Sequence, residues 1–172
     1  MVDVPLAATP EGIAEDDWLA ACSAVRAYCG WHVAPSVTET VTVDGSGSSV
    51  QLLPTLHLTA LLSITNAGIP VFDPEWSDMG AVRGCWTAKY RGVEASIAHG
   101  YPQCPAEVLA VARAAAARIV SDRASQAAGG AVQQVGQVRY VLPRDGGTTA
   151  AGWDGPSYEA GILDRYRIPA RP

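Results

Sequence analysis

The chain has 172 residues, of which 48% are hydrophobic and 17% are charged, and its formal net charge at pH 7 is −5. This length fits one core with an appended subdomain, and the composition is typical of a folded rather than a disordered protein. Residues 1–104 carry 4 basic and 11 acidic side chains, whereas residues 105–172 carry 8 basic and 6 acidic ones. Such a low density of basic residues disfavours nucleic-acid binding as the main function.

Two further features bear on location. No apolar run approaches the roughly 20 residues that a membrane helix needs, because Arg113 and Arg118 interrupt the best candidate. Residues 1–10 lack a basic cluster ahead of an apolar stretch, so a secretory signal and a membrane partner are not expected. In a reducing cytoplasm, all four cysteines are then expected to be thiols. These are Cys22, Cys29, Cys85 and Cys104.

The first predicted element is a helix that starts near Pro10 and ends before Gly30. Thr9 can cap this helix, proline suits the first helical position, and glycine is common just after the last. Apolar residues at steps of three and four predict one buried face, formed by Ala14, Trp18, Ala21, Val25 and Tyr28.

Residues 33–100 are predicted to form β-structure. Valines alternate with threonines over residues 37–43, which indicates a strand, and residues 50–53 form a second strand after a turn. Strands over residues 56–65 and 69–72 are joined by a short Asn-Ala-Gly turn.

The β-segment continues with short strands expected around Trp76, Val82 and Tyr90. Residues 93–98 then alternate between apolar and polar side chains, which predicts a half-buried strand at a sheet edge. These strands together predict a small antiparallel sandwich or barrel inserted between two helices.

An alanine-rich helix is predicted to follow Pro105, and residues 121–131 are predicted to be a polar loop after it. The helix carries a thin apolar stripe, which buries little surface by itself and therefore favours packing against other helices or other subunits. The stripe consists of Val108, Ala112, Ala115 and Ile119.

The C-terminal part contains a predicted arm and a predicted helix. Residues 132–142 are expected to form a strand or a hairpin arm, and residues 145–155 are a glycine-rich linker. A short helix opens at Pro156 and closes at Pro169. Its apolar face is typical of a docking element, and consists of Tyr158, Ile162, Leu163 and Tyr166.

The chain is therefore predicted to be an α+β protein. Residues 1–32 and 101–172 are expected to form a small helical bundle with the arm and a C-terminal docking helix. Residues 33–100 are expected to form an inserted antiparallel β subdomain, sandwich-like or barrel-like.

Reactive residue types give no strong motif. Cys29 and His32 form a Cys-x-x-His pair, but structural zinc sites usually show two such tight pairs. His57, Cys85, His99 and Cys104 could complete a metal site only in principle. No G-x-S-x-G, P-loop, G-x-G-x-x-G or H-E-x-x-H sequence is present. We predict no metal, no cofactor and no catalytic residues.

Five tryptophans stand beside a single phenylalanine, so they must supply much of the bulky packing. Trp31 and Trp86 are expected to fix the sheet against the first helix, and Trp153 is expected to anchor an interface. An alternative interpretation is a monomeric binding module, in which Trp76 and Trp86 form a platform for a ligand or protein on the β insert. A metal-dependent or thiol enzyme is a third hypothesis.

Six segments occur in a characteristic order: Tyr28-Cys29-Gly30-Trp31-His32-Val33-Ala34-Pro35, Leu52-Leu53-Pro54-Thr55-Leu56-His57-Leu58, Gly84-Cys85-Trp86-Thr87, His99-Gly100-Tyr101, Gln133-Gln134-Val135-Gly136 and Leu163-Asp164-Arg165-Tyr166-Arg167-Ile168-Pro169. In this order they resemble the head-to-tail adaptor proteins, also called head-completion or connector proteins, of long-tailed bacteriophages, in the form common in phages of actinobacteria. The match spans most of the chain.

This resemblance implies a structural protein of the virion neck, present in the host cytoplasm during assembly. Such adaptors assemble as a ring, usually twelvefold, beneath the portal protein. The ring extends the DNA channel toward the stopper or tail-completion protein, with DNA only as passing cargo.

The resemblance also assigns roles to two groups of residues, because the C-terminal segment grips the portal in related adaptors. The portal-facing group is Trp153, Tyr158, Ile162, Leu163, Arg165, Tyr166 and Arg167. An arm facing the channel or a neighbouring subunit contains Gln133, Gln134, Val135, Gln137, Arg139 and Tyr140.

Overall fold

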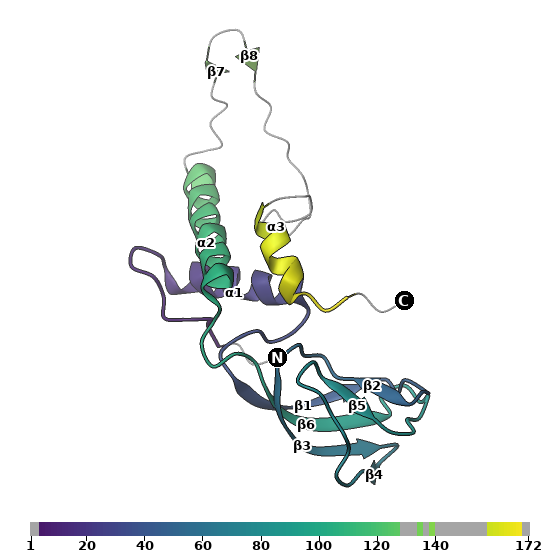
Figure 1. Cartoon of the computed structure of the whole chain (residues 1–172). Helices are drawn as coiled ribbons and strands as arrows, with labels where there is room; N and C mark the ends of the chain where they lie inside the picture. The colour runs from purple at the N-terminus through teal and green to yellow at the C-terminus, as the bar shows by residue number, and fades with distance from the viewer. Residues whose placement is uncertain (1–3, 128–133, 136–137, 140–157, 170–172) are drawn as a thin grey trace.

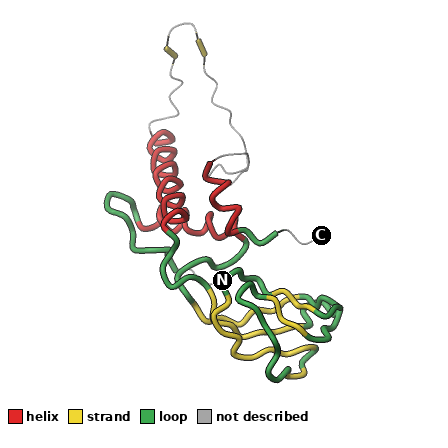
Figure 2. Tube along the Cα trace, viewed as in Figure 1, coloured by secondary structure: helices red, strands yellow, loops and turns green. Residues whose placement is uncertain are grey.

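The structure, a computed structural model, describes residues 4–127, 134–135, 138–139 and 158–169. The helices gather at one end of the molecule and the large β-sheet lies at the other (Figures 1 and 2). The helices are α1 (Glu15–Cys29), α2 (Ala106–Ala127) and α3 (Tyr158–Leu163), and α3 runs into a 3-10 turn, η1 (Asp164–Tyr166). The predicted α+β class is confirmed.

Helix α1 begins later than predicted. Gly12 adopts a left-handed conformation with φ of 80°, and the Ile13 amide donates to the Pro10 carbonyl, so the first residues form a separate turn. Ala14 is the N-cap, and three acidic residues in the first turn suit the positive end of the helix dipole. At the other end Gly30, with φ of 80°, donates its amide to the Arg26 carbonyl, which confirms the predicted stop.

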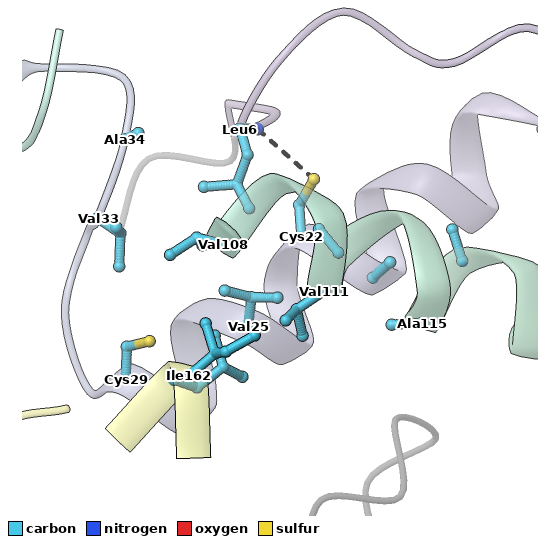
Figure 3. Packing of buried hydrophobic residues seen from close by; sticks show 14 of the residues in the cluster. Leu6, Cys22, Val25, Cys29, Val33, Ala34, Val108, Val111, Ala115 and Ile162 are labelled. Atoms are coloured by element: carbon cyan, nitrogen blue, oxygen red, sulfur yellow. Dashed lines mark hydrogen bonds between the residues drawn. The ribbon is translucent and has the colours of Figure 1, made fainter. Parts of the chain in front are cut away.

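The helical core lies where α1, α2 and α3 meet. Val25 of α1 and Val111 of α2 face each other, and Ile162 of α3 lies beside them (Figure 3). The predicted stripe on α2 is buried at Val108, Ala112 and Ala115, together with Val111 and Ala116. The small side chains let the two long helices approach closely.

Two polar residues that the sequence pattern did not single out are also buried in α1. Arg26 donates to the carbonyl of Ala34 at 2.8 Å and to the carbonyl of Val4. Asp17 forms an ion pair with Arg123 of α2, with 2.7 Å between Oδ1 and Nη2. These bonds tie the N-terminal segment and the far end of α2 to α1.

The β subdomain has two antiparallel layers. The larger sheet has the order β1 (Val37–Val43), β6 (Val93–His99), β3 (Leu58–Asn66) and β4 (Ile69–Pro70). The smaller sheet pairs β2 (Val50–Leu52) with β5 (Ala81–Arg83). Both layers share one core, which makes a sandwich rather than a barrel. This shared core consists of Leu53, Leu58, Ile64, Val82, Trp86, Val93, Ala95 and Ile97.

Some strand predictions are confirmed and others are wrong. The alternation in β6 is confirmed, because Val93, Ala95 and Ile97 are buried on one face, but β6 is the centre of the sheet and not an edge. The paired strands β3 and β4 are confirmed. Trp76 forms only a single bridge to Val82, and Tyr90 lies in a turn rather than a strand.

Trp86 packs in the β core and donates its indole N–H to the Val82 carbonyl at 3.0 Å. It does not fix the sheet against α1, as the sequence suggested. Trp31 instead belongs to the helical core, near the rings of His99 and Tyr101.

The two subdomains are joined by two chain crossings that run side by side. The Tyr101 amide donates to the Val33 carbonyl at 2.8 Å, and the Gly100 amide donates to the His57 carbonyl at 2.9 Å. Gly100 has a φ of 94°, and a Cβ there would lie 3.0 Å from the Pro35 carbonyl oxygen. Only glycine allows the crossings to approach this closely.

Helix α2 continues to Ala127, past residue 121 where a loop was predicted. Its alanines and arginines are strong helix formers, which explains the extension. Beyond it, β7 (Gln134–Val135) and β8 (Val138–Arg139) pair as an antiparallel hairpin. No helix in the described ranges is long and apolar enough to cross a membrane.

Candidate docking surface

The C-terminal segment packs against the chain's own helices. Leu163 is fully buried and Ile162 is 7% exposed, both within the helical core. These two side chains therefore hold α3 to α1 and α2. Their predicted portal contact requires an exposed side chain, which the amphipathic pattern alone did not distinguish from a buried one.

Polar contacts fasten the same segment to α1 and to Trp31, which follows soon after it. The Trp31 indole donates to the Tyr166 carbonyl at 2.6 Å, and the Ile168 amide donates to the Cys29 carbonyl at 2.9 Å. The Tyr28 hydroxyl donates to Asp164 at 2.8 Å, and this bond raises the pKa of Tyr28. Hydrogen bonds from both backbone and side-chain groups therefore hold the C-terminal turn against the end of α1.

Glu107 of α2 joins the C-terminal turn to the second long helix. Its carboxylate accepts a hydrogen bond from the Tyr166 hydroxyl at 2.6 Å and one from Arg165 at 2.9 Å. Burial, followed by the hydrogen bond to Glu107, raises the pKa of Tyr166. A second pair joins Arg118 of α2 to Glu159 of α3. Sequence reasoning missed Glu107, since nothing in its local pattern indicates partners more than fifty residues away.

Three of the other predicted docking residues have exposed side chains. Tyr158 is 86% exposed, and the side chains of Arg165 and Arg167 are 61% and 50% exposed. The guanidinium of Arg167 lies 5.1 Å from the centre of the Tyr28 ring, a distance at which cation and ring attract each other. We call the exposed side chains of Tyr158, Arg165 and Arg167 together the C-terminal face.

The predicted arm is described in part. Gln134 and Val135 lie in β7 and Arg139 lies in β8, so a hairpin stands where an arm was predicted. Gln133, Gln137, Tyr140 and the proposed anchor Trp153 lie outside the described residues.

The possible metal ligands and the thiols named from the sequence all lie within the described residues. No group of three or more His, Cys, Asp or Glu side chains in the described ranges could hold a metal ion. All four cysteines are thiols. Burial raises the pKa of Cys29 to about 12 and that of Cys104 to about 11, so neither thiol ionises readily near neutral pH. Because Trp86 is buried, it cannot form a platform with Trp76.

Comparison with known proteins identifies the fold. No protein-family model matches the chain, and no curated protein matches it in sequence. A chain in the solved neck of a native gene transfer agent (GTA) particle, computed with C12 symmetry, is similar in structure, with a TM-score of 0.56. The two sequences are 12% identical, and the match covers 91% of this chain and 82% of that chain. A chain in the neck of an empty GTA particle, computed with C6 symmetry, gives a TM-score of 0.49 and 15% identity over 98% and 91% of the two chains. The protein thus has the fold of a neck component of a phage-like particle.

Proposed function

We propose that this protein is a structural component of the neck of a phage or phage-like particle. The observation that carries the proposal is its similarity to the GTA neck chain, which covers nearly the whole of both chains. The helices and the β insert both contribute to this match, so the likeness extends beyond one common motif. The resemblance of six ordered segments to head-to-tail adaptors supports the same role independently.

In this role, copies of the chain form a closed ring beneath the portal, continue the DNA channel, and contact a stopper or tail-completion protein. The twelvefold symmetry in the description of the GTA neck supports a ring of twelve. The scarcity of basic residues suits a conduit, because a channel that bound phosphates tightly would slow the passage of DNA.

The C-terminal face is the surface proposed to meet the portal. Tyr158 is 86% exposed, and tyrosine and arginine are both enriched among the residues that anchor interfaces. The buried residues Ile162 and Leu163 support this face from beneath and shape it without touching the partner.

Two matched tyrosine substitutions test this placement. Tyr158 and Tyr90 are 86% and 84% exposed, on the C-terminal helix and on the β subdomain respectively. Tyr158→Ser should weaken binding to the purified portal protein by about tenfold or more, as loss of an interface anchor does. Tyr90→Ser should leave binding unchanged. Equal effects of the two substitutions in a binding titration would rule out the C-terminal face as the portal contact.

A further inference from the structure

Four large apolar side chains on β3 and on the segment 69–79 are more than half exposed. Leu62 is 59% exposed, Ile69 is 70%, Phe72 is 88% and Met79 is 55%. Phe72 is the only phenylalanine in the chain. We call this group the apolar rim. Where exposed apolar side chains follow one another along a surface, they often mark a site of interaction with another protein.

The members of the rim lie along one edge of the large sheet. The Val71 amide donates to the Ile64 carbonyl at 2.9 Å, and the Leu58 amide donates to the Asp78 carbonyl at 2.6 Å. The segment 69–79 therefore runs back beside β3. Leu62 lies at a bulge, between register positions Leu61 and Ser63, so its side chain projects beyond the regular ladder.

The rim is flanked by negative charge. Asp73, Glu75 and Asp78 all follow β4 in the same segment. Glu75 pairs with Arg83 at 3.2 Å, whereas the carboxylates of Asp73 and Asp78 form no ion pair within the ranges that the structure describes. An apolar patch with two uncompensated carboxylates fits a partner surface that is apolar and basic.

Such a surface exists on the outward side of α2. This side contains Ala106, Ala110, Ala117 and Val120, all exposed, with Arg113 at its centre. Arg113 has no ion pair with any described side chain, unlike Arg118 and Arg123 of the same helix. The opposite side of α2 is also apolar and packs against α1 and α3. A helix that is apolar on both sides is usually buried on both sides.

The rim and the outward side of α2 lie in different subdomains, and Figure 1 shows β4 at the far side of the sheet from the helices. They therefore meet only between two molecules. We propose that the apolar rim of one copy packs on the outward side of α2 of the next copy, with Asp73 and Asp78 facing Arg113. The contact uses two different patches, and contacts of this type close into a ring when repeated around an axis. This inference rests on the ring of the proposed function.

Charge reversal tests the electrostatic part of the contact. Asp73→Lys with Asp78→Lys, or Arg113→Glu alone, should weaken self-association by about tenfold or more, because like charges then face each other. Combining all three substitutions should restore most of the association. Glu11→Lys with Glu94→Lys, both at exposed positions, is the control for net charge and should have little effect. Sedimentation across a concentration series measures each variant, and failure of the combined variant to recover would overturn the proposal.

Cysteine crosslinking tests the geometry. In a Cys85→Ser background, Phe72→Cys together with Ala117→Cys should give a ladder of disulfide-linked oligomers under mild oxidation. Each single substitution should give at most linked pairs. Absence of the ladder at the highest soluble concentration would overturn the proposed contact. The neck role is judged separately by portal binding, so a protein that binds portal without forming the ladder would refute only this inference.

Discussion

At the scale of single residues, the junction between the subdomains is the most unusual part of the molecule. All three histidines of the chain lie there. The rings of His32 and His99 are 6.0 Å apart, and His57 lies 4.3 Å from the ring of Tyr101, measured between centroids. His32 and His99 are almost fully buried. Burial lowers the pKa of both histidines. At His32 the positive charge of Arg26 lowers the pKa further. At His99 the carboxylate of Glu39, 3.1 Å away, opposes the effect of burial.

These lowered pKa values predict an acid-sensitive fold. The unfolded chain takes up protons at its histidines near pH 6.5, whereas the folded chain resists protonation of His32 and His99 until lower pH. Their contribution is therefore complete above pH 6.5, and the free energy of unfolding falls as the pH drops through the window below it. Urea unfolding between pH 8 and pH 5.5 measures this slope. His32→Gln with His99→Gln should flatten it, and an unchanged slope would contradict the assignment.

Leu163 gives a second prediction at the same scale. Because this side chain is fully buried between helices, Leu163→Ala should lower the free energy of unfolding by about 2–5 kcal/mol. Tyr158→Ala, at an exposed position five residues earlier, should change it by less than about 0.5 kcal/mol. Chemical denaturation measures both. Similar values for the two variants would mean that α3 is not packed into the core.

At the scale of elements, local periodicity predicted most helices and strands but not the pairing of strands. The alternation of valine and threonine correctly predicted β1, and the predicted end of α1 at Gly30 was correct. Strands β1 and β2 follow each other across a turn, yet β1 pairs with β6 and β2 pairs with β5. Strand partners this far apart in the chain are chosen by the shared core, and no short-range pattern contains that information.

The close crossing at Gly100 gives a prediction at this scale. Gly100→Ala combines a left-handed φ with a steric clash against the Pro35 carbonyl, and should lower the free energy of unfolding by more than about 1 kcal/mol. Gly68 has a similar φ of 84°, but a Cβ added there would meet nothing within 4 Å, so Gly68→Ala isolates the backbone cost. Thermal unfolding compares the two. An equal loss at both sites would show that the crossings are not tightly packed.

At the scale of the whole molecule, the sequence predicted the α+β class and the neck-type fold, and the comparisons support both. The candidate docking site was predicted less completely. Periodicity located the apolar face of the C-terminal helix, but it could not show that Ile162 and Leu163 face the chain's own core. The apolar rim was missed for the same reason, since exposure of Phe72 depends on how segment 69–79 returns along β3.

The molecule presents three surfaces that suit assembly: the C-terminal face, the apolar rim and the outward side of α2. The first would bind the portal, and the other two would join neighbouring copies. In this proposed assembly the helical part carries the portal contact and one side of the contact between copies, and the β insert carries the other side.

Electron microscopy of the full chain mixed with its portal protein tests the central claim most directly. We expect a closed ring of identical subunits, coaxial with the portal and with an open central channel. Ring formation would be seen in end-on views and its place below the portal in side views. A protein that stays as separate subunits in the presence of portal, or binds it without closing a ring, would contradict the account.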